Sequence, residues 1–238
     1  MATGENASLW ERLERPAPAP RQALSPQRIA TAAVAIADAE GLEAVTMRRL
    51  AAELSVAPMA PYRHVSGKDD LLELMVDHVY TGLTLPEGLD WRDNLRTLAM
   101  RTRELMLGHR WLAQLPPQAR LSLTPQRMAV AEQALTALDG LGLDADAMMS
   151  AFRTVDAYVH GCMNYESAVS TLITEQNLSD GDELRDTLAP VMMWHMRTGR
   201  YPTFQRYLHT ATRKDDAQWQ FDFGLDCVLD GIATRLGL

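Results

Sequence analysis

The sequence predicts an all-α fold, in which a small N-terminal module of three helices with a helix-turn-helix precedes a larger helical domain. Apolar residues recur at intervals of three and four along the chain, and no segment shows the alternating pattern of a half-buried strand. Residues suited to helix caps, together with proline and glycine, separate these segments. With 238 residues, 47% of them hydrophobic, the chain can bury a sizeable core over one or two domains.

Composition argues against several protein classes. Cys162 and Cys227 lack the spacing of a disulfide scaffold or a zinc site, so each is predicted to be a buried thiol in a reducing cytoplasm. No run of about 18 apolar residues predicts a membrane span, and the N-terminus lacks the features of a signal peptide. The net charge of −8 argues against sequence-independent coating of nucleic acid, but it permits specific binding through one basic face.

The N-terminal part begins with a polar, proline-rich stretch, which predicts a flexible arm over residues 1–24. Ser25 and Pro26 then suit the N-cap and first position of a helix that Gly41 ends. The predicted buried stripe of this helix consists of Ile29, Ala33, Ile36 and Ala37.

The stretch from Thr46 to Lys68 has the layout of a helix-turn-helix. Thr46 is a good N-cap for the first helix, whose apolar stripe consists of Leu50, Ala51 and Leu54. Ser55 marks the turn, and Pro58 suits the first turn of a second helix that ends near His64. In such a motif the second helix enters the major groove of DNA.

Charge in this stretch favours DNA binding. Residues 44–68 carry a local net charge of +3, from Arg48, Arg49, Arg63 and Lys68 against Glu53. The alternative is that these are ordinary solvated charges on a small helical subdomain, and we consider DNA binding the better interpretation. Thr46, Arg48 and Lys68 are predicted to hold phosphates. The residues predicted to face the groove are Pro58, Met59, Tyr62 and His64.

A family resemblance supports this interpretation. Thr46-x-Arg48-x-Leu50-Ala51-x-x-Leu54-x-Val56, followed by Tyr62-x-His64-Val65-x-x-Lys68, resembles the DNA-binding signature of the tetracycline-repressor (TetR) family. The resemblance extends from about Pro26 to Leu83 and more weakly beyond. Ser55 replaces the usual glycine of the turn, which predicts a positive φ there. Pro61 replaces the usual leucine, which predicts a kinked recognition helix because proline removes a backbone hydrogen bond.

A connector helix is predicted from the Ser66–Asp69 capping pair to about Leu83, and completes a DNA-binding domain over residues 25–84. Pro86 and Gly88 mark the boundary to a second domain over residues 85–238. Its predicted helices are Trp91–Leu107 capped by Asp90, Thr124–Leu138, Asp144–Thr174, Asp182–Arg197 with an interruption or bend at Pro190, and Asp215–Leu236, with a short turn over His109–Leu115.

No enzyme chemistry is indicated. The six histidines form no metal-binding helix pair, and neither a glycine-rich phosphate loop nor a G-x-S-x-G motif is present. We therefore predict no catalytic residues, no metal and no cofactor. An α-helical enzyme with an incidental helix-turn-helix remains the rival from another class.

The second domain is rich in methionine and aromatic residues, which suits an adaptable cavity for an apolar small molecule. The alternative is a plain core with methionine as filler, and for any single methionine it is the better interpretation. The family resemblance favours a ligand cavity. The residues predicted to line it are Met100, Trp111, Met148, Phe152, Asp156, His160, Met163 and Met193.

The last helix resembles the dimer-forming helix of TetR-like repressors. Gly224 and Gly231 lie on nearly one face of it, and Gly161 and Ala168 are spaced in the same way on the long helix. Small residues let helices approach closely, so we predict a homodimer built from these two helices of each subunit. The resemblance implies a cytoplasmic repressor that a small apolar effector releases from a palindromic double-stranded operator. A ligand-independent regulator is the alternative.

Overall fold

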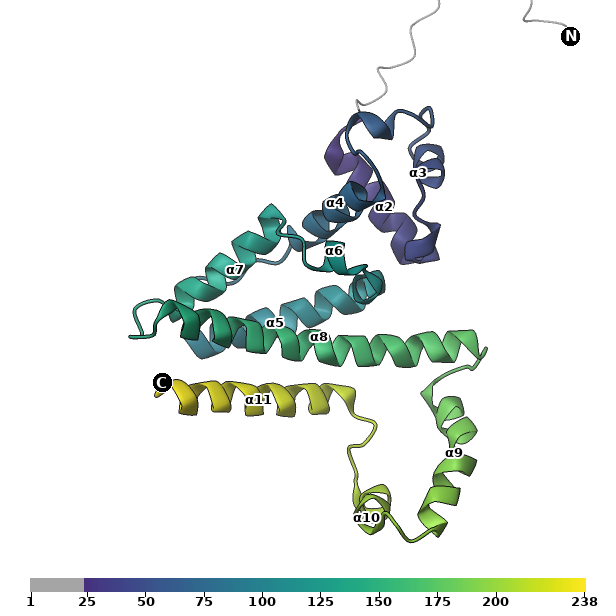
Figure 1. Ribbon diagram of the computed structural model, residues 1–238, viewed down its shortest axis with the longest axis vertical. Helices are drawn as coiled ribbons and strands as arrows, with labels where there is room; N and C mark the ends of the chain where they lie inside the picture. The colour runs from purple at the N-terminus through teal and green to yellow at the C-terminus, as the bar shows by residue number, and fades with distance from the viewer. Residues whose placement is uncertain (1–23) are drawn as a thin grey trace, which may run out of the picture.

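The computed structural model describes residues 24–238, so the arm predicted over residues 1–24 lies almost wholly outside the described part. Within residues 24–238 every regular element is an α-helix or a 3-10 helix, which confirms the all-α prediction. Figure 1 shows a small N-terminal group of helices above a larger group that is organised around one long helix, α8.

The small group is built on α2 (Pro26–Glu40), which packs against α3 (Met47–Glu53) and α4 (Lys68–Tyr80). Two 3-10 helices complete it: η1 (Leu42–Ala44) and η2 (Pro61–Arg63). The predicted apolar stripe of α2 is buried, and it faces the buried leucines of α4 in one continuous core. This core fixes the position of α3 and of the turn that follows it.

The larger group consists of α5 (Trp91–Gly108), α7 (Pro125–Leu138) and α8 (Ala145–Glu175), which pack against one another. The last helix, α11 (Ala217–Leu236), lies along α8 (Figure 1). Two short elements, η3 (Arg110–Gln114) and α6 (Pro117–Arg120), join α5 to α7.

Most of the predicted caps form as expected because capping depends only on a few neighbouring residues. The side chains of Ser25, Asp90, Thr124 and Asp144 each accept a hydrogen bond from the backbone N–H three residues on.

Two helices stand away from the body. α9 (Gly181–Arg197) and α10 (Pro202–Thr210) hang from the end of α8 in Figure 1. Leu184 is the one buried residue of α9, and α10 has none. The sequence analysis did not anticipate α10, and α9 runs through Pro190 without interruption.

Candidate nucleic-acid interface and effector cavity

The first helix of the predicted DNA-binding motif is held by a cap and an ion-pair bridge. Thr46 Oγ1 accepts a hydrogen bond from the Arg49 backbone N–H over 3.1 Å. The Arg49 guanidinium donates to Glu40 on α2 over 2.7 Å and to Glu53 on α3 over 2.8 Å. The Arg49 hydrogen bond holds the pKa of Glu40 below its usual value. Arg49 therefore braces α3 against α2, whereas Arg48 beside it is exposed.

The turn after α3 confirms one sequence prediction. Ser55 has a φ of 53°, the left-handed conformation that its place in the motif requires. The N–H of Val56 bonds to the carbonyl of Ala51, and the N–H of Ser55 to that of Ala52. This pair of bonds is a Schellman motif, which ends α3 cleanly.

The predicted second helix, from Pro58 to His64, is wrong. Residues 57–60 form a turn closed by the Ala60 N–H and the Ala57 carbonyl over 2.9 Å, and η2 supplies only one 3-10 turn, which Pro61 begins. A helix that began at Pro58 would draw its first internal hydrogen bond from the N–H of residue 61, and proline has none. The segment is therefore broken rather than kinked.

The residues predicted to face DNA nevertheless share one exposed surface segment. Met59 is 70% exposed and Tyr62 44% exposed, and Pro58 and His64 are also exposed. Lys68, the first residue of α4, is also exposed. The expected Ser66–Asp69 cap is replaced by a pair one residue further on, since the Ser66 N–H donates to Asp70 Oδ2 over 2.8 Å.

The predicted ligand residues do not converge on one cavity. Phe152 and Asp156 line a cavity of about 190 Å³ between α4, α5, α7 and α8, which we call the main cavity. Its other lining residues are Tyr80, Leu98, Thr102, Leu121, Ser122, Leu123, Arg127, Met128, Val130 and Ala131. Leu121 and Leu123 are 77% and 81% exposed, so the mouth of the main cavity is apolar.

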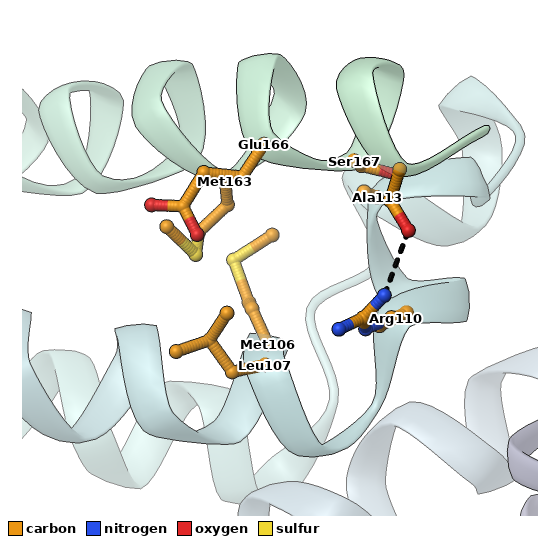
Figure 2. A pocket seen from close by; sticks show the side chains of 8 residues that line it. Met106, Leu107, Arg110, Ala113, Met163, Glu166 and Ser167 are labelled. Carbon is orange, nitrogen blue, oxygen red and sulfur yellow. Dashed lines mark hydrogen bonds between the residues drawn. The ribbon is translucent and has the colours of Figure 1, made fainter. Parts of the chain in front are cut away.

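Met163 lines a different and smaller pocket, of about 70 Å³, between α5, η3 and α8. Figure 2 shows Met106 and Met163 facing each other across it, with Glu166 and Ser167 on α8. Arg110 Nη1 donates to Ser170 Oγ over 2.7 Å at its rim. Met106 and Met163 can change rotamer, so this pocket is adaptable.

The remaining predicted ligand residues lie elsewhere. Trp111 is 2% exposed, and its indole N–H donates to Asp38 over 2.8 Å, so it belongs to the core. Met193 is 59% exposed on α9, which stands away from the body, and it lines neither the main cavity nor the smaller pocket. Met100 and Met148 are half-buried beside the core.

His160 lies one helical turn from the main cavity. Its Nδ1 is 3.0 Å from the Asp156 carbonyl oxygen and 3.4 Å from Asp156 Oδ1. The interaction with Asp156 raises the pKa of His160, although burial opposes that shift. The pair thus places the Asp156 carboxylate at the wall of the main cavity.

A groove of about 560 Å³ lies between α8 and α11, with small residues beside larger apolar ones and Arg235 in its lining. Its members include Ala147, Ser150, Thr154 and Gly231. Gly224 lies against the chain's own Tyr158, so its missing side chain already serves packing within the subunit, and its contact with a second subunit stays a prediction.

Two family models match the chain. One, described as "Tetracyclin repressor-like, C-terminal domain", matches residues 84–236, and another, described as "Bacterial regulatory proteins, tetR family", matches residues 29–75. The chain belongs to the TetR family. It is therefore a DNA-binding transcriptional regulator and not an enzyme.

Relatives across nearly the full length agree with this assignment. The HTH-type transcriptional repressor DrrR1 of Streptomyces coeruleorubidus is 36% identical over 227 residues, which cover 94% of this chain and 83% of the relative. The tetracycline repressor protein class E of Escherichia coli is 25% identical over 218 residues, 90% of this chain and 92% of that protein.

Solved TetR-family structures share the fold. ActR of Streptomyces coelicolor in complex with actinorhodin superposes with a TM-score of 0.73 at 26% identity, covering 90% of this chain and 97% of ActR. BioQ with its natural double-stranded DNA operator superposes with a TM-score of 0.59 at 26% identity, covering 89% of this chain and 99% of BioQ.

Several residues of this TetR-family chain escaped the sequence analysis. Arg127 lines the main cavity, and its side chain lies over the Tyr80 ring at 5.5 Å. Thr102 and Ser122 contribute hydroxyl groups to the wall of the main cavity. The signal available for Arg127 was its place in the first turn of a capped helix, which does not distinguish a cavity side chain from a solvated one. Within residues 24–238 no helix is long and apolar enough to cross a membrane.

Proposed function

We propose that this TetR-family regulator is a homodimeric repressor that binds a palindromic DNA operator and leaves it when a small, largely apolar molecule enters the main cavity. The observation that carries the proposal is the position of this cavity. α4 forms part of its wall through Tyr80, and α4 is also the helix against which α2 packs. A ligand that moves α4 would therefore move the DNA-binding elements.

The cavity chemistry indicates the kind of effector. Most lining side chains are apolar, and the polar ones are few: Thr102, Ser122, Arg127 and Asp156. Such a site suits an apolar molecule with one or two polar handles. ActR, which has the same fold, has been crystallised with actinorhodin, and this supports a small-molecule site in the helical domain.

The proposal assigns a separate role to each of the two domains. Residues 25–84 would bind DNA, with Thr46, Arg48 and Lys68 on phosphates and the segment 58–64 toward the groove. Residues 85–238 would bind the effector and, through α8 and α11, a second copy. BioQ, crystallised with its operator, supports DNA contact through the shared fold.

The test has two stages. A duplex would first be selected from a random-sequence pool with the wild-type protein, and its inverted symmetry examined. A compound library would then be screened by thermal shift, and each hit titrated into the protein–duplex complex. Reciprocity requires that a compound that binds free protein more tightly than the complex lowers DNA affinity by the same factor. Selection of no sequence, or hits that leave DNA affinity unchanged, would contradict the repressor and the effector parts respectively.

A further inference from the structure

A carboxylate on the first helix of the DNA-binding module joins that module to the helical domain. Asp38 on α2 lies 2.8 Å from Trp111 Nε1, which donates to it, and 2.9 Å from His109 Nδ1. Trp111 is almost fully buried, and a buried indole N–H needs an acceptor. Asp38 is that acceptor, although it lies 73 residues away in the sequence.

Asp38 contacts η3, a short element that borders a hollow on each of two sides. Arg110, on η3, lines the small pocket against α5 and α8 (Figure 2). It also lines a second hollow of about 280 Å³ against α2, together with Asp38 and Trp111. A 3-10 helix has poorer hydrogen-bond geometry than an α-helix. The two hollows leave space for η3 to change its winding at Arg110, while the buried Trp111 and Leu112 keep it attached to the core.

Hydrogen bonds also tie the far end of η3 to the main cavity. Arg127, which lines the cavity, donates through Nη1 to the Arg120 carbonyl over 2.7 Å. Arg120 in turn donates through Nη2 to the carbonyls of Ala113 and Leu115, over 2.9 and 3.1 Å. Bonds from a charged donor are stronger than neutral ones. The chain of contacts thus runs from Arg127 to Arg120, to η3 and to Asp38.

We propose that Asp38 is a positioning residue through which η3 sets the orientation of α2, and with it the affinity for DNA, according to the state of the main cavity. This inference rests on the proposed function as a DNA-binding repressor with an effector in that cavity. Coupling of this kind is carried by an element with two arrangements that both sites bias, and the proposal assigns that role to η3.

The test is a double-mutant cycle that needs no effector. Arg120→Met removes the guanidinium bonds to η3 while keeping a long side chain, and Asp38→Ala removes the acceptor on α2. Affinity for a duplex selected by the wild-type protein is measured for both single variants and the double variant. We expect Arg120→Met to weaken DNA binding at least fivefold in the wild-type background and less than twofold in the Asp38→Ala background. Equal weakening in both backgrounds, or no weakening in either, would overturn the inference.

Two further measurements separate positioning from simple stability. Hydrogen exchange of the amides in α2 is measured without DNA, and Arg120→Met should accelerate it only when Asp38 is present. Asp38→Asn, which keeps an acceptor for Trp111, should restore most of the coupling that Asp38→Ala removes. Glu43→Ala, an exposed acid on η1, is the control and should leave the cycle unchanged. Failure of the wild-type protein to select any duplex would refute the repressor proposal, whereas additive exchange effects would refute the role of Asp38 alone.

Discussion

The phenol of Tyr158 on α8 donates a 2.7 Å hydrogen bond to the backbone carbonyl of Phe221 on α11. The ring passes directly over Gly224, where a Cβ would lie 2.9 Å from Tyr158 Cζ. Burial is the main cause that raises the pKa of this phenol above its usual value. The absence of a side chain at residue 224 therefore lets α8 and α11 approach within one subunit.

We expect Gly224→Ala to lower the free energy of unfolding by about 1–3 kcal/mol, because the methyl group must displace a packed ring. Urea unfolding of the purified protein checks this. Replacing Tyr158 by Ala in the same chain should remove most of the additional cost of Gly224→Ala. Gly108→Ala, where a Cβ meets nothing within 4 Å, is the control. An unchanged stability in Gly224→Ala would mean that the ring moves freely.

We expect the surface through which each subunit contacts its partner to include the open groove beside Gly231. A Cβ at Gly231 meets nothing within 4 Å in the single chain, so Gly231→Glu leaves the subunit fold intact. In a dimer the glutamate side chain would fill the groove and carry its charge into the contact, which is costly even with Arg235 on the same wall. We expect the dissociation constant of the dimer to rise at least tenfold in analytical ultracentrifugation, with little change in the melting of the monomer. Ala129→Glu on the exposed face of α7 should leave the dimer unchanged.

Leu225→Glu does not test the dimer, because Leu225 is completely buried within its own chain. The charge would disrupt the core between α8 and α11 first. A variant that fails to fold says nothing about the contact between subunits.

Two adjacent arginines should behave differently toward DNA. Arg48 is exposed, whereas Arg49 is held by Glu40 and Glu53. We expect Arg48→Ala and Lys68→Ala each to weaken binding to all sequences and to reduce the salt slope by about one. Arg49→Ala should leave the salt slope nearly unchanged and change stability little, since its ion pairs are exposed to solvent. Equal salt slopes for Arg48→Ala and the wild type would contradict a phosphate contact by Arg48.

The helix caps and the turn at Ser55 could be predicted from the sequence because each depends on a few adjacent residues. The broken segment after it could not be placed correctly, since the sequence analysis judged Pro58 and Pro61 separately. Pro58 would begin the helix, and Pro61 then lacks the N–H that its first internal hydrogen bond needs. The contact of Gly224 with Tyr158 could not be predicted for a different reason: a glycine in a helix permits close approach, but it does not show which segment approaches, or whether it comes from the same chain.

The cavity was the least predictable feature. Met193 and Phe152 look alike in a sequence, yet one is exposed on α9 and the other lines the main cavity. Which face of each helix points inward is decided by packing between segments tens of residues apart. Arg127 and Asp38 carry no local signal that identifies their roles, because those roles arise from partners on other helices.

Stability should depend on pH through His160. Its pKa in the folded protein is raised, first by the hydrogen bond to Asp156. The protonated ring therefore adds stability that is fully present below its unfolded pKa of about 6.5 and is lost as the pH rises through the higher folded pKa. We expect His160→Gln to cost up to about 1 kcal/mol below that range and less above it, because the pair is partly exposed. In an Asp156→Asn background this pH dependence should shrink. A cost that grows with rising pH in urea unfolding would contradict the assignment.

The last prediction concerns the main cavity itself. Ala131 lines it from α7 and is half-buried, so Ala131→Trp can fill the space from its wall without replacing a core residue. At a free compound concentration 100 times its dissociation constant, a hit should stabilise the wild-type protein by about 2.7 kcal/mol. The same compound should shift the melting of Ala131→Trp little or not at all, while the variant still binds the selected duplex. Ala129→Trp, two residues away on the exposed face of α7, should keep the full shift.

Met163→Trp is a poorer choice, because Met163 is buried and lines the smaller pocket, so a larger ring would overpack the core. If Ala131→Trp retains the full thermal shift, the effector binds elsewhere, and the small pocket between α5, η3 and α8 becomes the next site to fill.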